Sequence, residues 1–188
     1  MEGTADPLYT RPMTQSWLRL ARNWPLAAAF AAAAMLAIAH AFQTFGHLLP
    51  CELCLKQRDV YWLALALGLA GFALGAALRR PVILIGASAL LGLVFLAGAG
   101  VAAYHAGVEW KWWPGPQVCT GGAKVGAAAL ADLLSGAKVS APRCDQAAWR
   151  WLGLSMAGWN ALISLGLAAA SDLAAAFAFA DLRRRNAA

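Results

Sequence analysis

Residues 60–104 read VYWLALALGLAGFALGAALRRPVILIGASALLGLVFLAGAGVAAY, two long apolar runs separated by Arg79 and Arg80. Neither run contains a charged residue, and each is close to the roughly 20 residues that an α-helix needs to cross a bilayer. Because the connection is so short, the two helices must be antiparallel neighbours. Pro81 suits the first turn of the second helix. The predicted spans are about 60–78 and 82–104.

Two further apolar runs flank this helical hairpin. The first, about 26–45, lies in the charge-free interval between Arg22 and Glu52. It exceeds the roughly 7–15-residue core of a cleaved signal peptide, so we expect a retained helix. The second run covers about 154–175. The sequence therefore predicts an all-α integral membrane protein, a four-transmembrane-helix bundle.

Composition agrees with a membrane protein. Of the 188 residues, 61% are apolar and 13% are charged, whereas an ordinary soluble domain has roughly 25% charged residues. A soluble protein of this size needs more charge to cover its surface. Disordered chains, coiled coils and typical cytosolic enzymes are therefore excluded.

The basic residues indicate the orientation of the chain. Eight of the 15 Lys and Arg residues lie before the first span, between the second and third spans, or after the fourth: Arg11, Arg19, Arg22, Arg79, Arg80, Arg183, Arg184 and Arg185. Cytoplasmic loops carry such an excess, so we expect both termini in the cytoplasm and segments 46–59 and 105–153 outside. A nucleic-acid-binding protein would instead gather its basic residues on one face with stacking aromatics. The predicted organisation is a cytoplasmic segment 1–24, a membrane domain 25–180 and a basic cytoplasmic tail 181–188.

Two features bear on the ends of the spans. Six tryptophans gather at the outer ends of the third and fourth predicted helices, which is typical of an aromatic belt at the membrane interface. Asp172 falls inside the fourth span, where an ionisable side chain is expensive. We expect the helix to begin early enough for Asp172 to reach the cytoplasmic interface.

All four cysteines lie in the two segments predicted to be outside. Cys51 and Cys54 are in the first segment, and Cys119 and Cys144 are in the second. Apolar spans accept cysteine readily, so this segregation is informative. An even number of cysteines facing an oxidising compartment indicates disulfide chemistry. A structural zinc site would need two close pairs or nearby histidines, and the three histidines complete no such spacing. We therefore expect no metal.

The close pair has the setting of a reactive thiol. Pro50 precedes Cys51 just before the second helix, so Cys51 lies near the N-cap and Cys54 in the first turn. Arg58 follows Cys54 by four residues, which places both on one face. Helix N–H groups and a guanidinium both favour a thiolate. We predict that Cys54 is the reactive thiol, at the membrane surface where an apolar electron carrier can reach it.

The second pair has a turn-rich setting. Cys119 follows WPGP at 113–116 and precedes TGG at 120–122, and Cys144 follows Pro142 and Arg143. Between the two cysteines, leucines near 130–134 predict a short amphipathic helix on the membrane surface. A disulfide across such a segment would be exposed and exchangeable. Spacing alone leaves open that both pairs are inert structural disulfides.

These residues resemble the bacterial disulfide-bond-formation protein B (DsbB) family of quinone-linked thiol oxidases. The segment PCELCLKQR at 50–58 is similar to the family signature P-C-x-L-C-x-x-[Q/E]-R. Further similarity covers YHAGVE at 104–109, Gly115-Pro116, Cys119, Cys144-Asp145, Trp149, LGLSM at 152–156 and Trp159-Asn160. The resemblance runs from about residue 24 to 180. It departs from the family at Asp172, where an apolar residue is usual, and in the long N-terminal segment.

The resemblance implies a relay of thiol–disulfide exchange, which proceeds through mixed disulfides. Cys119 would form the mixed disulfide with a reduced periplasmic DsbA-like oxidase. Cys144 would then attack Cys51 and release Cys54 as a thiolate facing the quinone. Arg58 would stabilise this thiolate and the negative charge that develops on the quinone.

The resemblance also implies the cofactor, the partner and the location. His105, at the outer end of the third helix, would border the quinone, which is ubiquinone or menaquinone. The partner would be a DsbA-like protein of the thioredoxin fold. The protein would lie in the bacterial inner membrane, in contact with lipid and the quinone pool, with its cysteines in the periplasm. Its function would be to support disulfide bond formation.

Two alternatives differ in their expected chemistry. An enzyme similar to vitamin K epoxide reductase also has two cysteine pairs and several spans, but its quinone-proximal C-x-x-C lies late in the bundle. Here the C-x-x-C precedes the second helix. A structural or partner-binding four-span protein would keep both pairs as inert bridges and would form no mixed disulfide with a partner.

Overall fold

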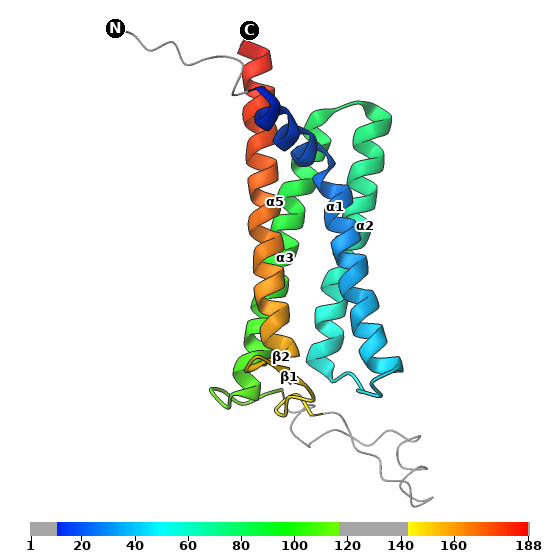
Figure 1. Ribbon diagram of the computed structural model, residues 1–188, viewed down its shortest axis with the longest axis vertical. Coiled ribbons are helices and arrows are strands. Elements are labelled where there is room, and N and C mark those ends of the chain that lie inside the picture. The colour runs from blue at the N-terminus through cyan, green and yellow to red at the C-terminus, as the bar shows by residue number, and fades with distance from the viewer. Residues whose placement is uncertain (1–10, 117–142, 188) are drawn as a thin grey trace, which may run out of the picture. The chain divides into compact units, whose positions relative to one another are not determined.

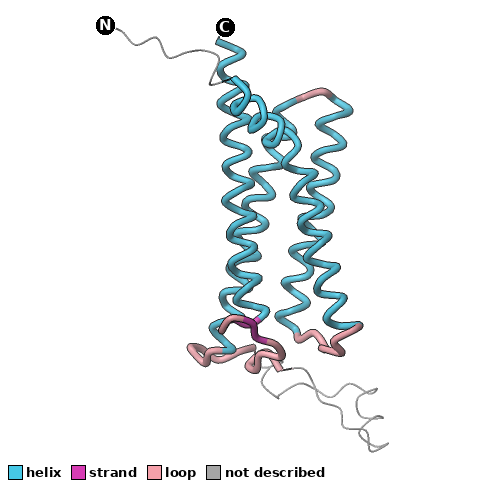
Figure 2. The backbone as a smooth tube through the Cα atoms, in the orientation of Figure 1, coloured by secondary structure: helices cyan, strands magenta, loops and turns pink. Residues whose placement is uncertain are grey.

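The computed structural model describes residues 11–116 and 143–187, with side chains from residue 19 onward (Figure 1). Four long helices make up most of this part of the chain, and a short strand pair precedes the last of them (Figure 2). The elements are α1 (Arg11–Thr44), α2 (Glu52–Leu78), α3 (Pro81–Glu109), β1 (Arg150–Trp151), β2 (Leu154–Ser155) and α5 (Met156–Ala187). All four helices are long and apolar enough to cross a membrane. The predicted all-α membrane fold with four spanning helices is confirmed.

The helices extend beyond the predicted apolar spans. Helix α1 begins at Arg11 and continues through Pro25, which removes one backbone hydrogen bond and favours a bend. Helix α2 begins at Glu52, inside the segment predicted as an outer loop, and α5 continues into the basic tail. An apolar run marks only the part of a helix that lipid covers. Polar residues at its ends continue the same backbone hydrogen bonding beyond that part. The amphipathic helix predicted near 130–134 lies outside the described residues.

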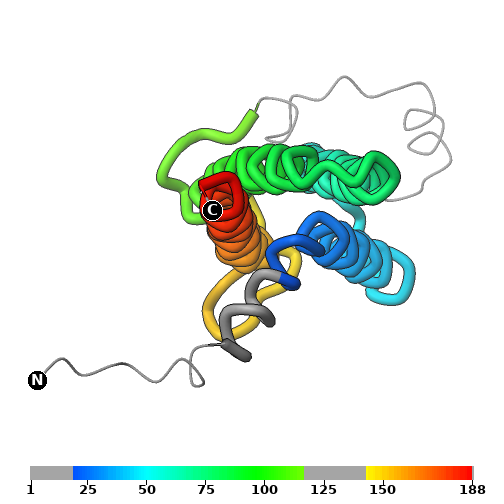
Figure 3. Tube along the Cα trace, turned by 90° about the horizontal axis from the view of Figure 1, so that it is seen from above, coloured from blue at the N-terminus to red at the C-terminus, as the bar shows by residue number. Residues whose placement is uncertain are grey.

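The chain divides into two compact units, and each contains part of every helix. The first unit comprises Met1–Ala34, Trp62–Phe95 and Gly166–Ala188, and the second comprises Met35–Tyr61 and Leu96–Leu165. In the first unit, the beginning of α1, the α2–α3 turn and the end of α5 lie at one end (Figure 1). Figure 3 looks down on this end. The three basic segments of the sequence therefore share one end of their unit, as the orientation prediction requires.

Small residues bring the helices of the first unit close together. A Cβ added to Gly68 of α2 would lie 2.5 Å from the Pro25 carbonyl oxygen and 2.9 Å from the Ala29 Cβ of α1. A Cβ added to Gly75 would lie 2.5 Å from a methyl group of Leu84 in α3. Close backbone approach through small residues is typical of helix packing in membranes. The contact with Leu84 confirms that α2 and α3 are neighbours.

Asp172 lies further from the cytoplasmic end than expected. Its carboxylate packs against Gly92, where an added Cβ would clash with it. Gly92 is eleven residues beyond Pro81, the first residue of α3, which corresponds to about 17 Å along a helix. The hydrocarbon core of a bilayer is about 30 Å thick. The structure therefore does not support the expectation that Asp172 reaches the interface, because the offset between α3 and α5 places it near the middle of α3.

In the second unit, a tight hairpin leads the chain into α5. Strands β1 and β2 are antiparallel, with Trp151 opposite Leu154. The two residues between the strands, Leu152 and Gly153, have φ values of 50° and 81°, which is the conformation of a type I′ turn. Ser155 then caps α5, because its Oγ accepts a hydrogen bond from the Gly158 N–H at 3.2 Å. These contacts fix the start of α5 beside the candidate site.

The close approach at Gly68 gives a test of the packing. We expect Gly68→Ala to lower the free energy of unfolding in detergent micelles by about 1–3 kcal/mol, because the added methyl group overpacks the α1–α2 contact. The matched control is Gly86→Ala, since nothing lies within 4 Å of a Cβ at Gly86. Equal unfolding free energies for the two variants would contradict the packing described here.

Candidate functional site

The candidate site of the second unit is built on the first turn of α2. The helix begins at Glu52, so Cys51 occupies the N-cap and Cys54 the first turn, the positions that the sequence predicts. The Cys51 Sγ accepts a hydrogen bond from the Cys54 backbone N–H at 3.4 Å. This is the contact that an N-cap side chain normally makes with its oxygen. Here a sulfur takes that place at the positive end of the helix.

The two cysteines of this pair are free thiols in contact with each other. Their sulfurs lie 3.0 Å apart, whereas a disulfide bond is about 2.05 Å long. Cys51 is buried and Cys54 is partly exposed. The pair is therefore in its reduced form, with one thiol donating to the other.

His105 of α3 completes the surroundings of Cys51. Its Nε2 lies 3.7 Å from the Cys51 Sγ and 3.7 Å from a carboxylate oxygen of Glu109. Its Nδ1 lies 2.8 Å from the side-chain nitrogen of Gln57. All four of these side chains are buried. The imidazole is thus held between α2 and the end of α3, with one nitrogen on the sulfur.

Cys144 comes from the segment after α3 and reaches the same place. Its sulfur, the Cys51 Sγ and a ring nitrogen of His105 all lie within 4.8 Å of one another. Cys144 is completely buried and its sulfur is part of a disulfide bond. Cys119 lies outside the described residues. The structure therefore brings together three of the four cysteines that the sequence singles out.

The same three atoms have a spacing that could hold a metal ion. A closed structural zinc site uses four ligands, with cysteine binding as the thiolate. Because the Cys144 sulfur is engaged in a disulfide, it offers no thiolate in this state. The trio then provides two ligands, which is fewer than a closed zinc site requires.

Negative charge in the reduced pair is favoured at Cys51. The hydrogen bond from the Cys54 thiol is the largest cause that lowers the pKa of Cys51, and the contact with His105 lowers it further, against the opposing effect of burial. The sequence predicts the thiolate at Cys54 instead. The difference arises because the N-cap sulfur, and not the sulfur in the first turn, receives both the backbone N–H and the imidazole.

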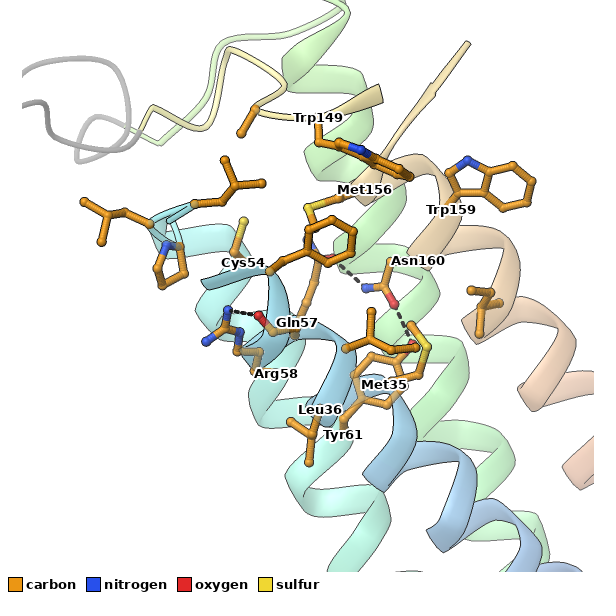
Figure 4. Close-up of a pocket in the computed structure, with 18 of the residues that line it drawn as sticks. Met35, Leu36, Cys54, Gln57, Arg58, Tyr61, Trp149, Met156, Trp159 and Asn160 are labelled. Carbon is orange, nitrogen blue, oxygen red and sulfur yellow. Dashed lines mark hydrogen bonds between the residues drawn. The ribbon is translucent and has the colours of Figure 1, made fainter. Parts of the chain in front are cut away.

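Cys54, unlike Cys51, lines a cavity of about 350 Å³ (Figure 4). Small-molecule pockets in proteins measure about 300–1,000 Å³ and are mostly apolar, with a few polar groups. The wall is mostly apolar and includes Met35, Leu36, Phe42, Trp149, Met156 and Trp159. The polar side chains in the wall are Arg58, Gln57, Tyr61 and Asn160. The cavity therefore suits a mostly apolar ligand that carries a few polar groups.

Arg58 lies in this wall but is held by α1. One guanidinium nitrogen donates to the Gln43 side-chain oxygen at 2.6 Å and another to the Ala39 carbonyl oxygen at 3.0 Å. Cys54 and Arg58 thus face the same cavity, as their spacing predicts. His105 is not among the residues that line it. His105 contacts the Cys51 sulfur instead.

Sequence analysis assigns no role to three polar residues of the site, although Gln57 and Asn160 belong to the motifs that carry the family resemblance. Gln57, Tyr61 and Asn160 are buried and hydrogen-bonded to one another through α2 and α5. The available signal is that Tyr61 and Asn160 are polar side chains in apolar runs, which in a membrane are functional candidates. Trp149 and Trp159, taken from the sequence as part of an aromatic belt, line the cavity, and Trp149 packs against Phe42 with 5.4 Å between ring centroids.

Comparison with known proteins agrees with this geometry. Residues 21–174 match the family described as Disulfide bond formation protein DsbB. The chain belongs to the DsbB family. It is 38% identical over 147 residues to the Disulfide bond formation protein B of Methylococcus capsulatus, an alignment that covers 75% of this chain and 85% of that protein. It is 31% identical over 156 residues to the Disulfide bond formation protein B of Dechloromonas aromatica, covering 79% and 88% of the two chains.

Family membership gives the protein a general activity. The protein is a multi-pass membrane protein of disulfide bond formation, and its chemistry is that of a disulfide oxidoreductase. The two cysteine-bearing segments of this DsbB family member meet at Cys51, as expected for thiol–disulfide exchange.

An ion cluster holds the chain next to Cys144. The Asp145 carboxylate accepts hydrogen bonds from Arg143 at 3.0 Å and from Lys111 at 2.6 Å. The Arg143 guanidinium, followed by the Lys111 ammonium, holds the pKa of Asp145 well below its usual range. Lys111 also donates to the Asp145 backbone oxygen at 2.8 Å. The end of α3 is therefore tied to the residue that follows Cys144.

The lowered pKa of Asp145 predicts how this tie depends on pH. Its stabilising effect is fully present above the ordinary aspartate pKa of about 3.9 and is lost as the pH falls through the lower pKa of the folded state. Because the basic partners are exposed, we expect a modest effect, up to several-fold in local opening. Hydrogen exchange at 143–146, corrected for intrinsic rates, should be faster in Asp145→Asn at pH 6.

The control is Asp59→Asn, because Asp59 is exposed and has no ion pair among the described residues. Equal protection at 143–146 in Asp145→Asn and in the unmodified protein would show that the cluster does not hold this segment.

Proposed function

We propose that the protein oxidises a periplasmic DsbA-like dithiol and passes the electrons through two cysteine pairs to a membrane quinone. The observation that supports this most is the position of Cys51. Its sulfur lies 3.0 Å from the Cys54 sulfur, which lines the cavity, and within 4.8 Å of the Cys144 sulfur from the other segment. A sulfur with both neighbours can exchange with either.

The first steps move a disulfide from the second pair to the partner. A thiolate of the partner attacks Cys119 in the Cys119–Cys144 disulfide, and Cys144 leaves with the electron pair. The Cys144 thiolate then attacks Cys51 in the Cys51–Cys54 disulfide, and Cys54 leaves as a thiolate. The second thiol of the partner releases Cys119, so the partner ends as a disulfide. Cys119 then reforms its bond with Cys144, and Cys51 leaves with the electron pair.

This sequence leaves the pair at Cys51 and Cys54 reduced and Cys144 in a disulfide, which are the sulfur states described above. Re-closing the Cys51–Cys54 bond gives up two electrons and two protons. A quinone held in the cavity beside Cys54 and Arg58 would accept both. Cys54 faces the cavity that would hold it.

The residues around the cavity have separate roles in the proposal. Arg58 stabilises negative charge on the Cys54 side, and its anchorage on α1 keeps the guanidinium in the cavity wall. The apolar wall excludes water from the ring. His105 does not line the cavity, so we assign it to Cys51 and not to the quinone. Ubiquinone and menaquinone both satisfy this description.

The proposed setting follows from the same assignment. The protein lies in a bacterial inner membrane with segments 1–24 and 181–188 in the cytoplasm and the membrane domain between them. The cysteines then face the periplasm, where DsbA-type oxidases work with DsbB proteins and quinone. The shared end of the three basic segments supports this orientation.

The role of Cys54 is tested by turnover. We expect Cys54→Ser to reduce quinone-dependent oxidation of a reduced DsbA-like partner to background, because no sulfur then faces the cavity to close a disulfide with Cys51. The loss of absorbance of a short-chain ubiquinone measures the rate. Asp59→Asn serves as a surface control that should keep full activity. Full activity in Cys54→Ser would refute the proposal, and so would an unmodified protein with no turnover, as expected for an inert scaffold.

The role of Arg58 is tested by separating quinone use from partner binding. We expect Arg58→Ala to raise the apparent KM for quinone about tenfold or more, the usual effect of losing a hydrogen bond to a charged group. Trapping of a resolving-cysteine variant of the partner as a mixed disulfide with Cys119 should persist. A normal apparent KM for quinone in Arg58→Ala would remove this role.

A further inference from the structure

A continuous chain of buried polar side chains leads from α5 to the Cys51 sulfur. It runs through Ser164, Tyr61, Asn160, Gln57 and His105, which are between 1% and 8% exposed. Successive hydrogen bonds measure 2.9 Å from Ser164 to Tyr61, 2.5 Å from Tyr61 to Asn160, 2.5 Å from Asn160 to Gln57 and 2.8 Å from Gln57 to His105. The last contact is the 3.7 Å approach of the imidazole to Cys51.

From Tyr61 through Asn160 to Gln57, each hydrogen bond is donated toward Cys51. The Tyr61 hydroxyl donates to the Asn160 oxygen, and the Asn160 amide nitrogen donates to the Gln57 oxygen. The nitrogen of Gln57, whose oxygen is thus already occupied, faces the Nδ1 of His105. An amide nitrogen only donates, so Nδ1 must accept. In a neutral imidazole the proton then resides on Nε2.

The surroundings of Nε2 favour the same arrangement. It faces the Cys51 sulfur and the Glu109 carboxylate, each at 3.7 Å, and both accept hydrogen bonds. The other carboxylate oxygen of Glu109 is buried and has no hydrogen-bond partner among the described residues. A bare Nε2 would face these acceptors with a lone pair. Among the described residues, the remaining charged or titratable groups close to this site are Cys54 of α2 and Arg150 of β1, which interacts electrostatically with Glu109.

We propose that Asn160 and Gln57 are positioning residues that hold His105 as the neutral Nε2–H tautomer, so that the imidazole donates a hydrogen bond to the Cys51 sulfur. This inference deepens the proposed function, on which its catalytic meaning rests. When the bond between Cys144 and Cys51 breaks, the electron pair stays on the Cys51 sulfur, and the proton stays on Nε2. His105 is therefore a hydrogen-bond donor to a leaving thiolate and not a base that removes its proton.

The tautomer is measured directly by NMR. The protein with the Cys51–Cys54 pair reduced and Cys144 in its disulfide is labelled with ¹⁵N at its histidine rings in lipid nanodiscs. A His105→Gln variant identifies the His105 signals among the three histidines. We expect a proton on Nε2 and none on Nδ1 of the neutral ring. A neutral ring with its proton on Nδ1 in the unmodified protein would overturn the proposal without any further variant.

The substitution Asn160→Asp should reverse the direction of these hydrogen bonds. A carboxylate at this position accepts from both Tyr61 and Gln57, so the Gln57 amide turns and presents its oxygen to His105. We expect the proton of His105 to move to Nδ1. The apparent pKa of Cys51 should then rise by about one unit, a roughly tenfold loss of thiolate at a given pH below it, which is the usual effect of one hydrogen bond to a charged group.

Iodoacetamide alkylation at a series of pH values, read by fragment mass spectrometry that resolves Cys51 from Cys54, reports this shift. The matched control is Ser164→Ala, which removes the far end of the chain and leaves the direction of every bond from Tyr61 onward, so both readouts should stay unchanged. An Asn160→Asp protein with the original tautomer and the original Cys51 profile would overturn the proposal. Neither readout involves quinone or partner, so a failure of the proposed function would be seen separately.

Discussion

Hydrocarbon offers no hydrogen-bond partners, and this constraint determines both the fold and the site. Helices meet it for the backbone, because an α-helix satisfies its N–H and C=O groups within its own segment. The same constraint requires that polar side chains inside the helical part pair with one another. The buried set at Tyr61, Gln57 and Asn160 obeys this rule, since each of their side chains is hydrogen-bonded to another. The chemistry is then confined to the end of the helices, where chain outside the spans supplies the second cysteine pair.

At that end, one helix terminus performs two tasks. The N-cap of α2 must satisfy a backbone N–H, and the sulfur of Cys51 does so at 3.4 Å. At the same position the sulfur lies close to His105 of α3 and to Cys144. The two sulfurs and a ring nitrogen of His105 are all within 4.8 Å of one another. Three residues later, Cys54 turns toward the apolar cavity. The helical pitch thus separates a sulfur that exchanges with other sulfurs from one that faces a membrane-soluble ligand.

The sequence predicts those parts that depend on local patterns. Apolar runs and the two-residue turn at Arg79 and Arg80 predict four spans and an antiparallel pair, and Pro50 predicts the helix start that places Cys51 at the N-cap. Contacts that depend on the offset between helices could not be predicted. The partner of Gln57 is 103 residues away in Asn160, and the depth of Asp172 is set by its packing on Gly92. The side of the cysteine pair on which His105 lies depends on the rotation of α3, which a nearly uniform apolar run leaves undetermined.

The cavity is not made by the helices alone. Trp149 belongs to the segment outside the spans, and it forms part of the wall by packing against Phe42 of α1. Trp149 follows Cys144 by five residues, a segment that spans at most about 17 Å when fully extended, so the position of Cys144 limits how far Trp149 can move. Any bond that Cys144 makes therefore restrains Trp149 in the cavity wall. The shape of the cavity therefore depends on the covalent state of Cys144, although Cys144 does not line the cavity.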